Sequence, residues 1–199
     1  MSNIQAFNRW NCDQIKVEDP GLINYINVKP VIVPRTGARY AGNRFHKSKS
    51  FIVERLINRI MVPGHKGKKH KTSSGTCTGK SSTAYDLVEK TFTIIEKKLN
   101  KNPIEVFVKA IENAAPREEI VAIEYGGARY PKAVECSPQR RIDVVLKMMT
   151  QGAFQKTSNS KKSAEQCLAD EIIAAYQSSQ NSNAIAKKLE LERQADASK

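Results

Sequence analysis

The chain is 199 residues long and carries 33 Lys and Arg against 20 Asp and Glu, a net charge of +13 at pH 7. Its 40% hydrophobic content is enough to bury a core, but no apolar run approaches the roughly 18 residues of a membrane-spanning helix, and the N-terminus lacks the apolar stretch of a signal peptide. The four cysteines lie far apart, which excludes the dense disulfide framework of a small secreted domain. These features predict a soluble intracellular protein that binds a polyanion and has no membrane partner.

The positive charge is concentrated in one part of the sequence. Residues 35–80 hold twelve Lys and Arg and a single acid, Glu54, so this segment carries 12 − 1 = +11 of the total. One Lys run is usually a solvated face, whereas several basic groups on arms and loops around a folded core can follow a phosphate backbone. The charge pattern therefore favours nucleic-acid binding, although it does not separate RNA from DNA.

The first 48 residues show no sustained periodicity and are interrupted by prolines and glycines, so they are predicted to form an extended basic arm. Within the arm, Val31–Val33 is predicted to dock as one short strand. Tyr40 and Phe45 stand beside arginines of the arm. Their rings can either stack on unpaired bases or pack the arm against the body, and the sequence leaves both interpretations open.

Helical periodicity begins after the arm. Ile52, Leu56 and Ile60 share one face of a first helix, which Pro63-Gly64 ends. Residues 64–80 contain Gly, Ser, Thr and Lys with almost nothing to bury, so they are expected to form a mobile basic loop. The arm and this loop are both expected to become ordered on binding a nucleic acid.

Two further helices are predicted from their start signals. The sequence Thr83-Ala84-Tyr85-Asp86 is a capping box that should start a helix reaching about Leu99. Asn102, followed by Pro103, should cap the next helix, which Pro116 ends. Apolar side chains follow each start at helical spacing, so both helices should bury one face.

A β-hairpin is predicted after these helices. Two β-rich runs within residues 118–136 flank Gly126-Gly127, and Pro131 forbids a central strand, so the two strands should project from the body. Ser137-Pro138 then starts a fourth helix, for which Gly152 is the predicted C-terminal stop.

Two serines should start the last helices. Ser163, with Gln166 three residues on, caps the fifth helix, and Ser182 caps a weaker sixth helix that ends near Ala195. The predicted fold is mainly α, a six-helix bundle with a projecting β-hairpin and an extended basic N-terminal arm. The expected regions are the arm 1–48 and a helical RNA-binding domain 49–199 that contains the loop insertion 64–80 and the hairpin 118–136.

Two patterns suggest other chemistry but fit it poorly. Residues 75–81 resemble a phosphate-binding P-loop, yet three residues separate the glycines where the motif needs four, and no apolar strand precedes them. His65, His70 and Cys77 match no zinc-ligand spacing. The sequence therefore predicts no catalytic residue, no metal site and no cofactor, and a nucleotide-binding enzyme stays a remote alternative.

The candidate RNA-binding residues are basic side chains on the arm, the loops, the hairpin and a helix start. They are Arg35, Arg39, Arg44, Lys47, Lys66, Lys68, Lys69, Lys71, Lys80, Arg117, Arg129, Lys132, Arg140, Arg141, Lys156, Lys161 and Lys162. A DNA-binding module is a second possibility, but the turn and partner helix that should precede the fourth predicted helix are absent. A free nucleic-acid-binding protein is a further alternative.

Several segments together resemble the family of universal small-subunit ribosomal protein seven, known in eukaryotes and archaea as small-subunit protein five. The resemblance runs in order from about Phe45 to Arg193. Its matching segments are residues 51–61, 67–69, 102–113, 116–119, 137–142, 167–175 and 181–185. The resemblance implies a six-helix fold with a β-hairpin, and a structural constituent of the small ribosomal subunit rather than an enzyme.

The resemblance also implies partners and a location. The family binds the 3′ major domain of small-subunit ribosomal RNA and helps to assemble the subunit head beside neighbouring head proteins. Its hairpin lies near the path of messenger RNA and exit-site transfer RNA, which would place Arg129 and Lys132 there. The expected location is the cytoplasmic ribosome, with passage through the nucleolus if the source is eukaryotic.

Two basic pairs match positions of the family. Arg140-Arg141 matches the pair after Ser-Pro, and Lys68-Lys69 matches the pair before the second helix. Residues 70–79 are inserted between that second pair and the helix, and a second Gly-Lys sequence, Gly79-Lys80, stands at the end of the insertion. Either Lys68-Lys69 or Gly79-Lys80 can therefore occupy the family position.

Overall fold

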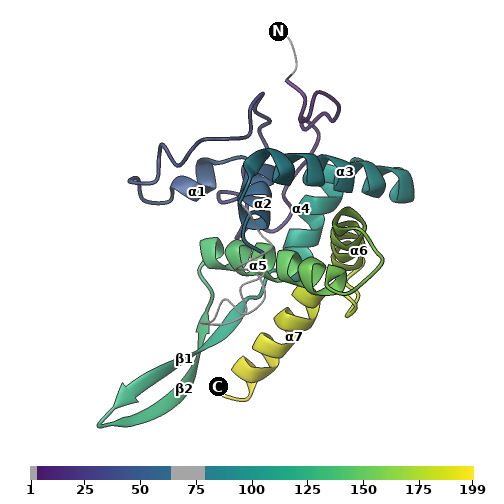
Figure 1. Ribbon diagram of the computed structural model, residues 1–199. Helices are drawn as coiled ribbons and strands as arrows, with labels where there is room; N and C mark the ends of the chain where they lie inside the picture. Colours follow the sequence, from purple (N-terminus) through teal and green to yellow (C-terminus); the bar gives the residue numbers. More distant parts are fainter. Residues whose placement is uncertain (1–3, 64–78) are drawn as a thin grey trace.

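The fold is built mainly from helices, as the apolar periodicity predicts (Figure 1). The computed structural model describes residues 4–63 and 79–199. In chain order the elements are α1 (His46–Lys49), α2 (Ile52–Ile60), α3 (Ser81–Leu99), α4 (Pro103–Ala114), β1 (Glu118–Tyr125), β2 (Ala128–Glu135), α5 (Pro138–Thr157), α6 (Ala164–Tyr176) and α7 (Asn183–Asp196). The mainly α bundle with one hairpin is confirmed, and α1 adds a single turn of helix at the end of the arm. No helix in these described ranges is long and apolar enough to cross a membrane.

The six longer helices bury a common core. Phe92 on α3, Phe107 on α4 and Ile172 on α6 are fully buried, because apolar residues that recur every three or four positions face one side of each helix. The ring centroids of Phe92 and Phe107 lie 5.9 Å apart. Helix α6 packs against α3, α4 and α5, and α7 packs against α5 and strand β1. The core therefore forms around α6.

Side-chain caps fix where three helices begin. Asn102 Oδ1 and Ser182 Oγ each accept a hydrogen bond from the backbone amide two residues further along the chain, at 3.0 Å and 3.2 Å respectively. Ser163 Oγ accepts a hydrogen bond of 3.4 Å from the amide three residues on. Each cap satisfies an amide that the helix itself leaves unpaired, so these three predicted starts are confirmed.

The predicted capping box of α3 is wrong. The helix begins at Ser81, two residues before Thr83, and Lys80 at the cap position makes no side-chain cap bond. Ala84 is buried, and its amide donates a hydrogen bond of 3.2 Å to the Lys80 carbonyl, so the chain is already helical before the box. Packing of the buried face sets this start, as it does for most helices in proteins.

Helix α5 is also longer than predicted. Gly152 does not stop it, since the helix continues to Thr157. A Cβ atom at Gly152 would lie 2.8 Å from Asn183 Cβ and 3.1 Å from Glu171 Cδ. The missing side chain therefore lets α5 approach α6 and the start of α7 closely, and the prediction of a helix stop at this glycine is wrong.

The first half of the arm belongs to the body. Trp10 and Leu22 are buried with the helices, and the Trp10 ring meets Phe92 edge to face at 5.9 Å. The predicted strand at Val31–Val33 is wrong. Ile32, at an exposed bend, keeps 75% of its surface accessible, and among the described residues the only sheet is the hairpin, so this run has no strand edge to join.

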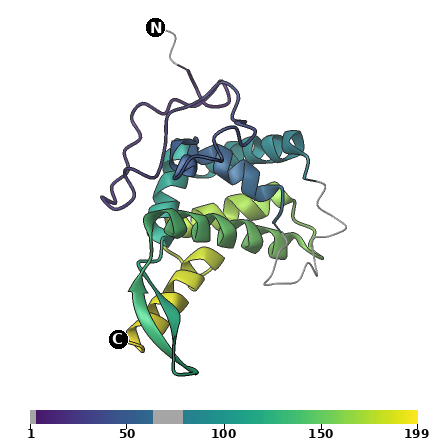
Figure 2. The same cartoon turned by 90° about the vertical axis from the view of Figure 1, so that its left-hand side faces the viewer.

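The hairpin projects from the body as predicted (Figure 2). Gly126 and Gly127 both have positive φ, +59° and +82°, which matches the twist of a two-residue turn between antiparallel strands. Ile123 pairs with Tyr130 across the strands, and because alternate residues share a face, Tyr125 lies on the same side as that pair. Helix α7 packs against β1 and supports the base of the hairpin.

Candidate nucleic-acid interface

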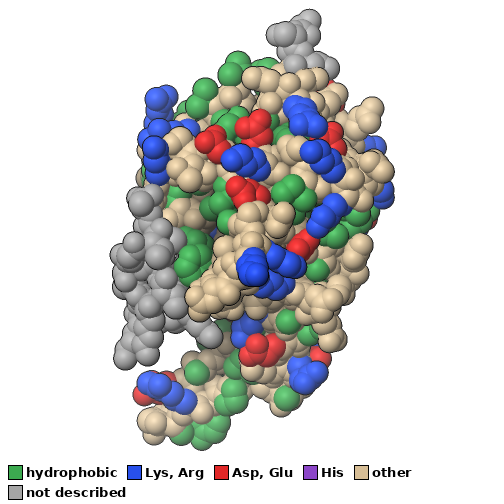
Figure 3. All heavy atoms as spheres, turned by 45° about the vertical axis from the view of Figure 1, so that its right-hand side comes forward, with side chains coloured by type: hydrophobic (Ala, Val, Ile, Leu, Met, Phe, Trp, Pro, Cys, Tyr) green, Lys and Arg blue, Asp and Glu red, His purple; other side chains and the backbone are tan. Residues whose placement is uncertain are grey.

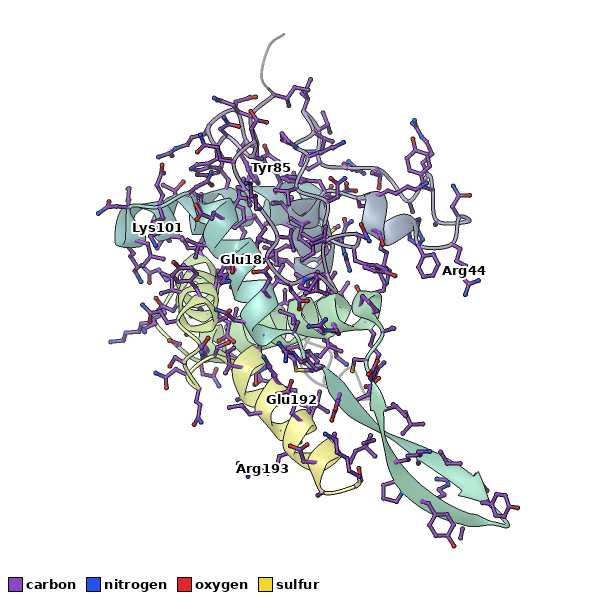
Figure 4. The ribbon with its side chains drawn as sticks, turned by 180° about the vertical axis from the view of Figure 1, so that it is seen from behind. Glu18, Arg44, Tyr85, Lys101, Glu192 and Arg193 are labelled. Atoms are coloured by element: carbon purple, nitrogen blue, oxygen red, sulfur yellow. The ribbon has the colours of Figure 1, made fainter. Side chains whose placement is uncertain are left out.

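Residues 29–49, the basic arm segment, form the most positive surface of the described chain. The segment holds six Lys and Arg and no Asp or Glu. Figures 1 and 4 show it standing away from the helical body, with Arg44 at its outer part. A polyanion can therefore reach these cations without rearrangement of the core.

Three contacts hold the basic arm segment in place. Glu54 Oε1 accepts hydrogen bonds from Thr36 N at 2.7 Å and Thr36 Oγ1 at 2.8 Å. Asn27 Nδ2 donates to the Lys49 carbonyl at 2.6 Å, and Lys47 Nζ pairs with Asp143 at 2.9 Å. The segment is thus attached at its last residues and at Thr36, which limits the positions from which its free cations extend.

The cations of this segment differ in what they touch. Arg35 and Arg39 are exposed and make no ion pair with the described residues. The Arg44 guanidinium lies 5.1 Å from the Phe45 ring centroid, and that ring meets Tyr25 edge to face at 6.5 Å. Phe45 therefore contacts the body and stays half-exposed, so packing of the arm against the body is observed for this ring.

Two further lysines of the segment are exposed and lie outside the predicted set. Lys29 and Lys49 make no ion pair with any residue that the structure describes. Their signal in the sequence is the absence of any acid between residues 29 and 49. Local charge density therefore adds them to the exposed cations of the segment.

The neighbouring residues Arg140 and Arg141 have different roles. Arg141 is only 8% exposed, and its Nε donates to the Pro116 carbonyl at 3.1 Å while Nη2 pairs with Asp19 at 2.7 Å. Arg141 thus ties the arm to the start of the hairpin rather than facing solvent. Arg140 is exposed and pairs with Glu119 of β1 at 2.5 Å.

The ion pair with Arg141 also changes the pKa of Asp19. Burial raises the pKa of Asp19, but hydrogen bonds from Arg141 and from the Gly21 amide, together with the charges of Arg141 and Arg117, outweigh it. The pKa of Asp19 therefore lies below its ordinary value, and the carboxylate stays charged at neutral pH.

The hairpin is a weak site for phosphate. It carries four glutamates against Arg129 and Lys132, and Arg129 Nε lies 3.7 Å from Glu124. Lys132 is exposed and makes no ion pair with the described residues. The exposed Tyr125 and Tyr130 near the tip are more suited to stacking than to charge.

Most of the predicted lysines in the last turn of α5 and the loop after it form ion pairs. Lys156 Nζ pairs with buried Glu171 at 2.6 Å, and Lys162 Nζ lies 3.8 Å from Asp170, which leaves Lys161 without an acidic partner in the described chain. Helix α5 has 20 residues and is therefore about 30 Å long. These lysines and Arg140 lie at its opposite ends, so the structure does not bring them together.

The remaining candidates divide into two groups. Lys80 and Arg117 are exposed and make no ion pair within the described ranges. Lys66, Lys68, Lys69 and Lys71 lie outside those ranges, as do His65, His70, Cys77 and most of the P-loop-like segment.

No catalytic or metal-binding constellation stands out in the described residues. They contain no group of three or more His, Cys, Asp or Glu side chains that could hold a metal ion. Burial is the main cause that raises the pKa of the Cys12 and Cys136 thiols to about 11, so neither is a reactive thiolate at neutral pH. Figure 3 shows a face on which Lys and Arg are interspersed with Asp and Glu.

A buried helical core, a folded basic arm and a projecting hairpin fit a structural RNA-binding protein. Comparison with known proteins gives the same class. A family model described as ribosomal protein S7p/S5e matches residues 22–199, and the chain belongs to this family. It is a non-enzymatic, structural constituent of the small ribosomal subunit.

Curated relatives match almost the whole chain. The small ribosomal subunit protein uS7 of Nanoarchaeum equitans is 53% identical, over 98% of this chain and 99% of the relative. The proteins of the same name from Archaeoglobus fulgidus and Methanothrix thermoacetophila are 46% and 42% identical over 98% of this chain, and over 94% and 100% of their own lengths. The sequence similarity therefore includes the arm as well as the helices.

Proposed function

We propose that the chain binds the 3′ major domain of small-subunit ribosomal RNA and helps to assemble the subunit head, with the basic arm segment as its main phosphate-binding surface. The observation that carries this proposal is the combination of six cations, no acid and a fixed position on the body. All of these cations except Lys47, which pairs with Asp143, lack an acidic partner among the described residues, and cations held in place in this way can neutralise phosphates at little cost in conformational entropy.

The test is a binding measurement with two transcripts of equal length. The purified full chain should bind the 3′ major domain transcript more tightly than a transcript of another domain of the same RNA. Replacing Arg39 and Arg44 with Gln should weaken binding to the first transcript, whereas replacing Arg9 and Lys98, which are paired with Glu96 and Asp170, should not. Equal affinity for both transcripts would refute the assignment to this domain.

The hairpin supports a second, finer proposal. Tyr125 and Tyr130 are exposed near its tip and Lys132 is exposed farther along β2, where they suit contact with the messenger or the exit-site transfer RNA. A photoreactive group at Tyr125 should then cross-link to one of these RNAs in translating ribosomes. A matched group at Ile23, on the arm, is the control, and equal cross-linking from both positions would contradict the proposal.

The location follows from the same assignment. A ribosomal protein works on the ribosome, and sedimentation of native extract should find this chain with small subunits before and after magnesium is removed. The compared relatives are archaeal, so passage through a nucleolus is not part of the proposal. A chain that stayed with free proteins at the top of the gradient would favour the alternative of a free nucleic-acid-binding protein.

A further inference from the structure

A groove lies between the basic arm segment and the two helices behind it. Ile32 and Val33 line it from the arm, Ile57 and Met61 line it from α2, and Tyr85 lines it from α3. Its volume is about 680 Å³, within the roughly 300–1,000 Å³ that is usual for ligand-binding pockets. The walls are mainly apolar, although the surface around them is the most basic of the described chain.

Three residues of the lining suit an anion. Arg35 lines the groove from the arm, and Ser81 and Ser82 line it at the start of α3. The first turn of α3 contains no acid and no side-chain cap, and the backbone amides of Ser81 and Ser82 have no hydrogen-bond partner among the described residues. A guanidinium and the positive end of a 19-residue helix, which line the same groove, each attract a phosphate.

Two further polar side chains line the same groove. Asn58 on α2 is exposed, and Asp86 on α3 is exposed without an ion pair in the described part of the chain. A carboxylate accepts hydrogen bonds only, so Asp86 can bind a group that presents N–H donors. A guanidinium, a helix start, apolar walls and one carboxylate therefore line the same cavity.

Other occupants fit these features less well. A purely apolar protein segment would leave the charges of Arg35 and Asp86 desolvated and unpaired, which is costly. Residues close in sequence to 64–78 line the groove. Residues 64–78 themselves contain no aliphatic or aromatic side chain other than histidine, so their composition does not match the walls of the groove. An unpaired nucleotide has the flat ring, the phosphate and the donor edge that the groove requires.

We propose that the groove binds one unpaired guanine nucleotide of the ribosomal RNA. The base lies between the arm wall at Ile32 and the α3 wall at Tyr85, its phosphate lies at Arg35, and its adjacent N1–H and N2–H donate to the Asp86 carboxylate. Guanine is the base because it presents two neighbouring donors to one carboxylate. The inference rests on the proposed function, since it names the nucleotide that an RNA-binding surface would select.

The test is chemical probing of the 3′ major domain transcript with kethoxal, which modifies N1 and N2 of unpaired guanines. The unaltered full chain, at a saturating concentration, should protect one guanine. Asp86→Asn should restore the reactivity of that guanine to within about twofold of free RNA, because a lost bidentate contact weakens base recognition by about fivefold or more. Glu89→Gln, the same change one turn along α3 and outside the groove, should keep the protection.

A second variant guards against a folding defect. Ile32 is exposed at a bend, so Ile32→Glu should not disturb the core, yet it adds a negative charge inside the groove. It should also abolish protection while the midpoint of thermal unfolding stays unchanged. The two variants change residues on opposite walls of the groove.

The outcomes separate the two proposals. Identical protection by the unaltered chain, Asp86→Asn and Ile32→Glu would overturn the inference and leave ribosomal RNA binding intact. Failure of the unaltered chain to bind the transcript would overturn both. A protein cross-linked to the groove in reconstituted subunits, with guanine reactivity unaffected by the variants, would identify a protein occupant and also overturn the inference.

Discussion

Glu171 joins three parts of the fold through one buried carboxylate. Its Oε1 accepts hydrogen bonds from Ser182 Oγ at 2.9 Å and Asn183 N at 2.5 Å, and its Oε2 accepts one from Lys156 Nζ at 2.6 Å. The carboxylate therefore caps the start of α7 and holds the end of α5. Lys156, predicted as an RNA contact, has this structural role in the isolated chain.

We expect Glu171→Ala to lower the free energy of unfolding by about 2–4 kcal/mol, because buried amides and a hydroxyl lose a charged acceptor. Urea denaturation measures this change. The control is Asp170→Ala, which removes an exposed acid paired with Lys98 and should cost less than about 1 kcal/mol. Equal losses in the two variants would contradict the role assigned to Glu171.

The lowered pKa of Asp19 predicts a dependence of stability on pH. A group whose pKa is lower in the folded state contributes stability above its ordinary pKa, and this contribution is lost as the pH falls through the folded value. The free energy of unfolding of the native chain should therefore fall more steeply below about pH 4 than that of Asp19→Asn. Parallel pH profiles from urea denaturation would show that the Asp19 and Arg141 contact contributes nothing.

Arg141 shows where sequence reasoning reaches its limit. Arg140 and Arg141 are adjacent and look equivalent in the sequence, but only Arg141 is buried. Its partner Asp19 is 122 positions away, and no local pattern indicates that pairing. Helix starts such as Asn102 and Ser163 were predictable because a cap acts within three residues, whereas the fate of a basic side chain depends on tertiary contacts.

At the scale of elements, the arm tests whether a region without helix or strand can belong to the core. We expect Leu22→Ala to destabilise the chain by about 2–5 kcal/mol, because Leu22 is fully buried among the helices. Ile23→Ala, at the neighbouring position, is the control, since Ile23 is 51% exposed and should change stability little. Similar small effects would instead support an arm that is independent of the body, with a domain boundary near residue 48.

The contact of α5 with α7 gives another element-scale prediction. Gly152→Ala improves intrinsic helix propensity by about 1 kcal/mol, but its Cβ would overlap Asn183, so we expect a net destabilisation of about 1–2 kcal/mol. Gly42→Ala is the control, because nothing lies within 4 Å of the added Cβ and φ there is not positive. A more stable Gly152→Ala protein, by thermal unfolding, would mean that α5 and α7 can separate without cost.

Gly152 also illustrates which elements can be predicted from the sequence and which cannot. Apolar periodicity and turn chemistry are local, so the helices and the turn at Gly126-Gly127 followed from them. The prediction that Gly152 stops a helix rests on the frequent occurrence of glycine at helix ends. It is wrong because this glycine allows close packing between helices that are distant in sequence. The strand predicted at Val31–Val33 failed for the related reason that a strand needs a partner, which the sequence does not display.

At the scale of the whole molecule, charge is divided between paired and free cations. Many Lys and Arg outside the basic arm segment are paired with acids, such as Arg9 with Glu96 and Lys98 with Asp170, and so hold the body together. The cations of the basic arm segment have few acidic partners, since the segment contains no acid of its own. The net charge of +13 therefore overestimates the number of cations that the body offers to RNA and underestimates the importance of those on the arm.

This division predicts how binding to the 3′ major domain transcript depends on salt. Each cation that neutralises a phosphate steepens the plot of log K against log salt by about 0.9 for a duplex and 0.7 for a single strand. Replacing Arg39 and Arg44 with Gln should therefore make the slope shallower by about 1.4–1.8. The control replaces Arg9 and Lys98 and should leave the slope nearly unchanged, because these cations are already paired. Equal changes from both double variants would mean that RNA samples the net charge of the molecule rather than the free cations of its arm.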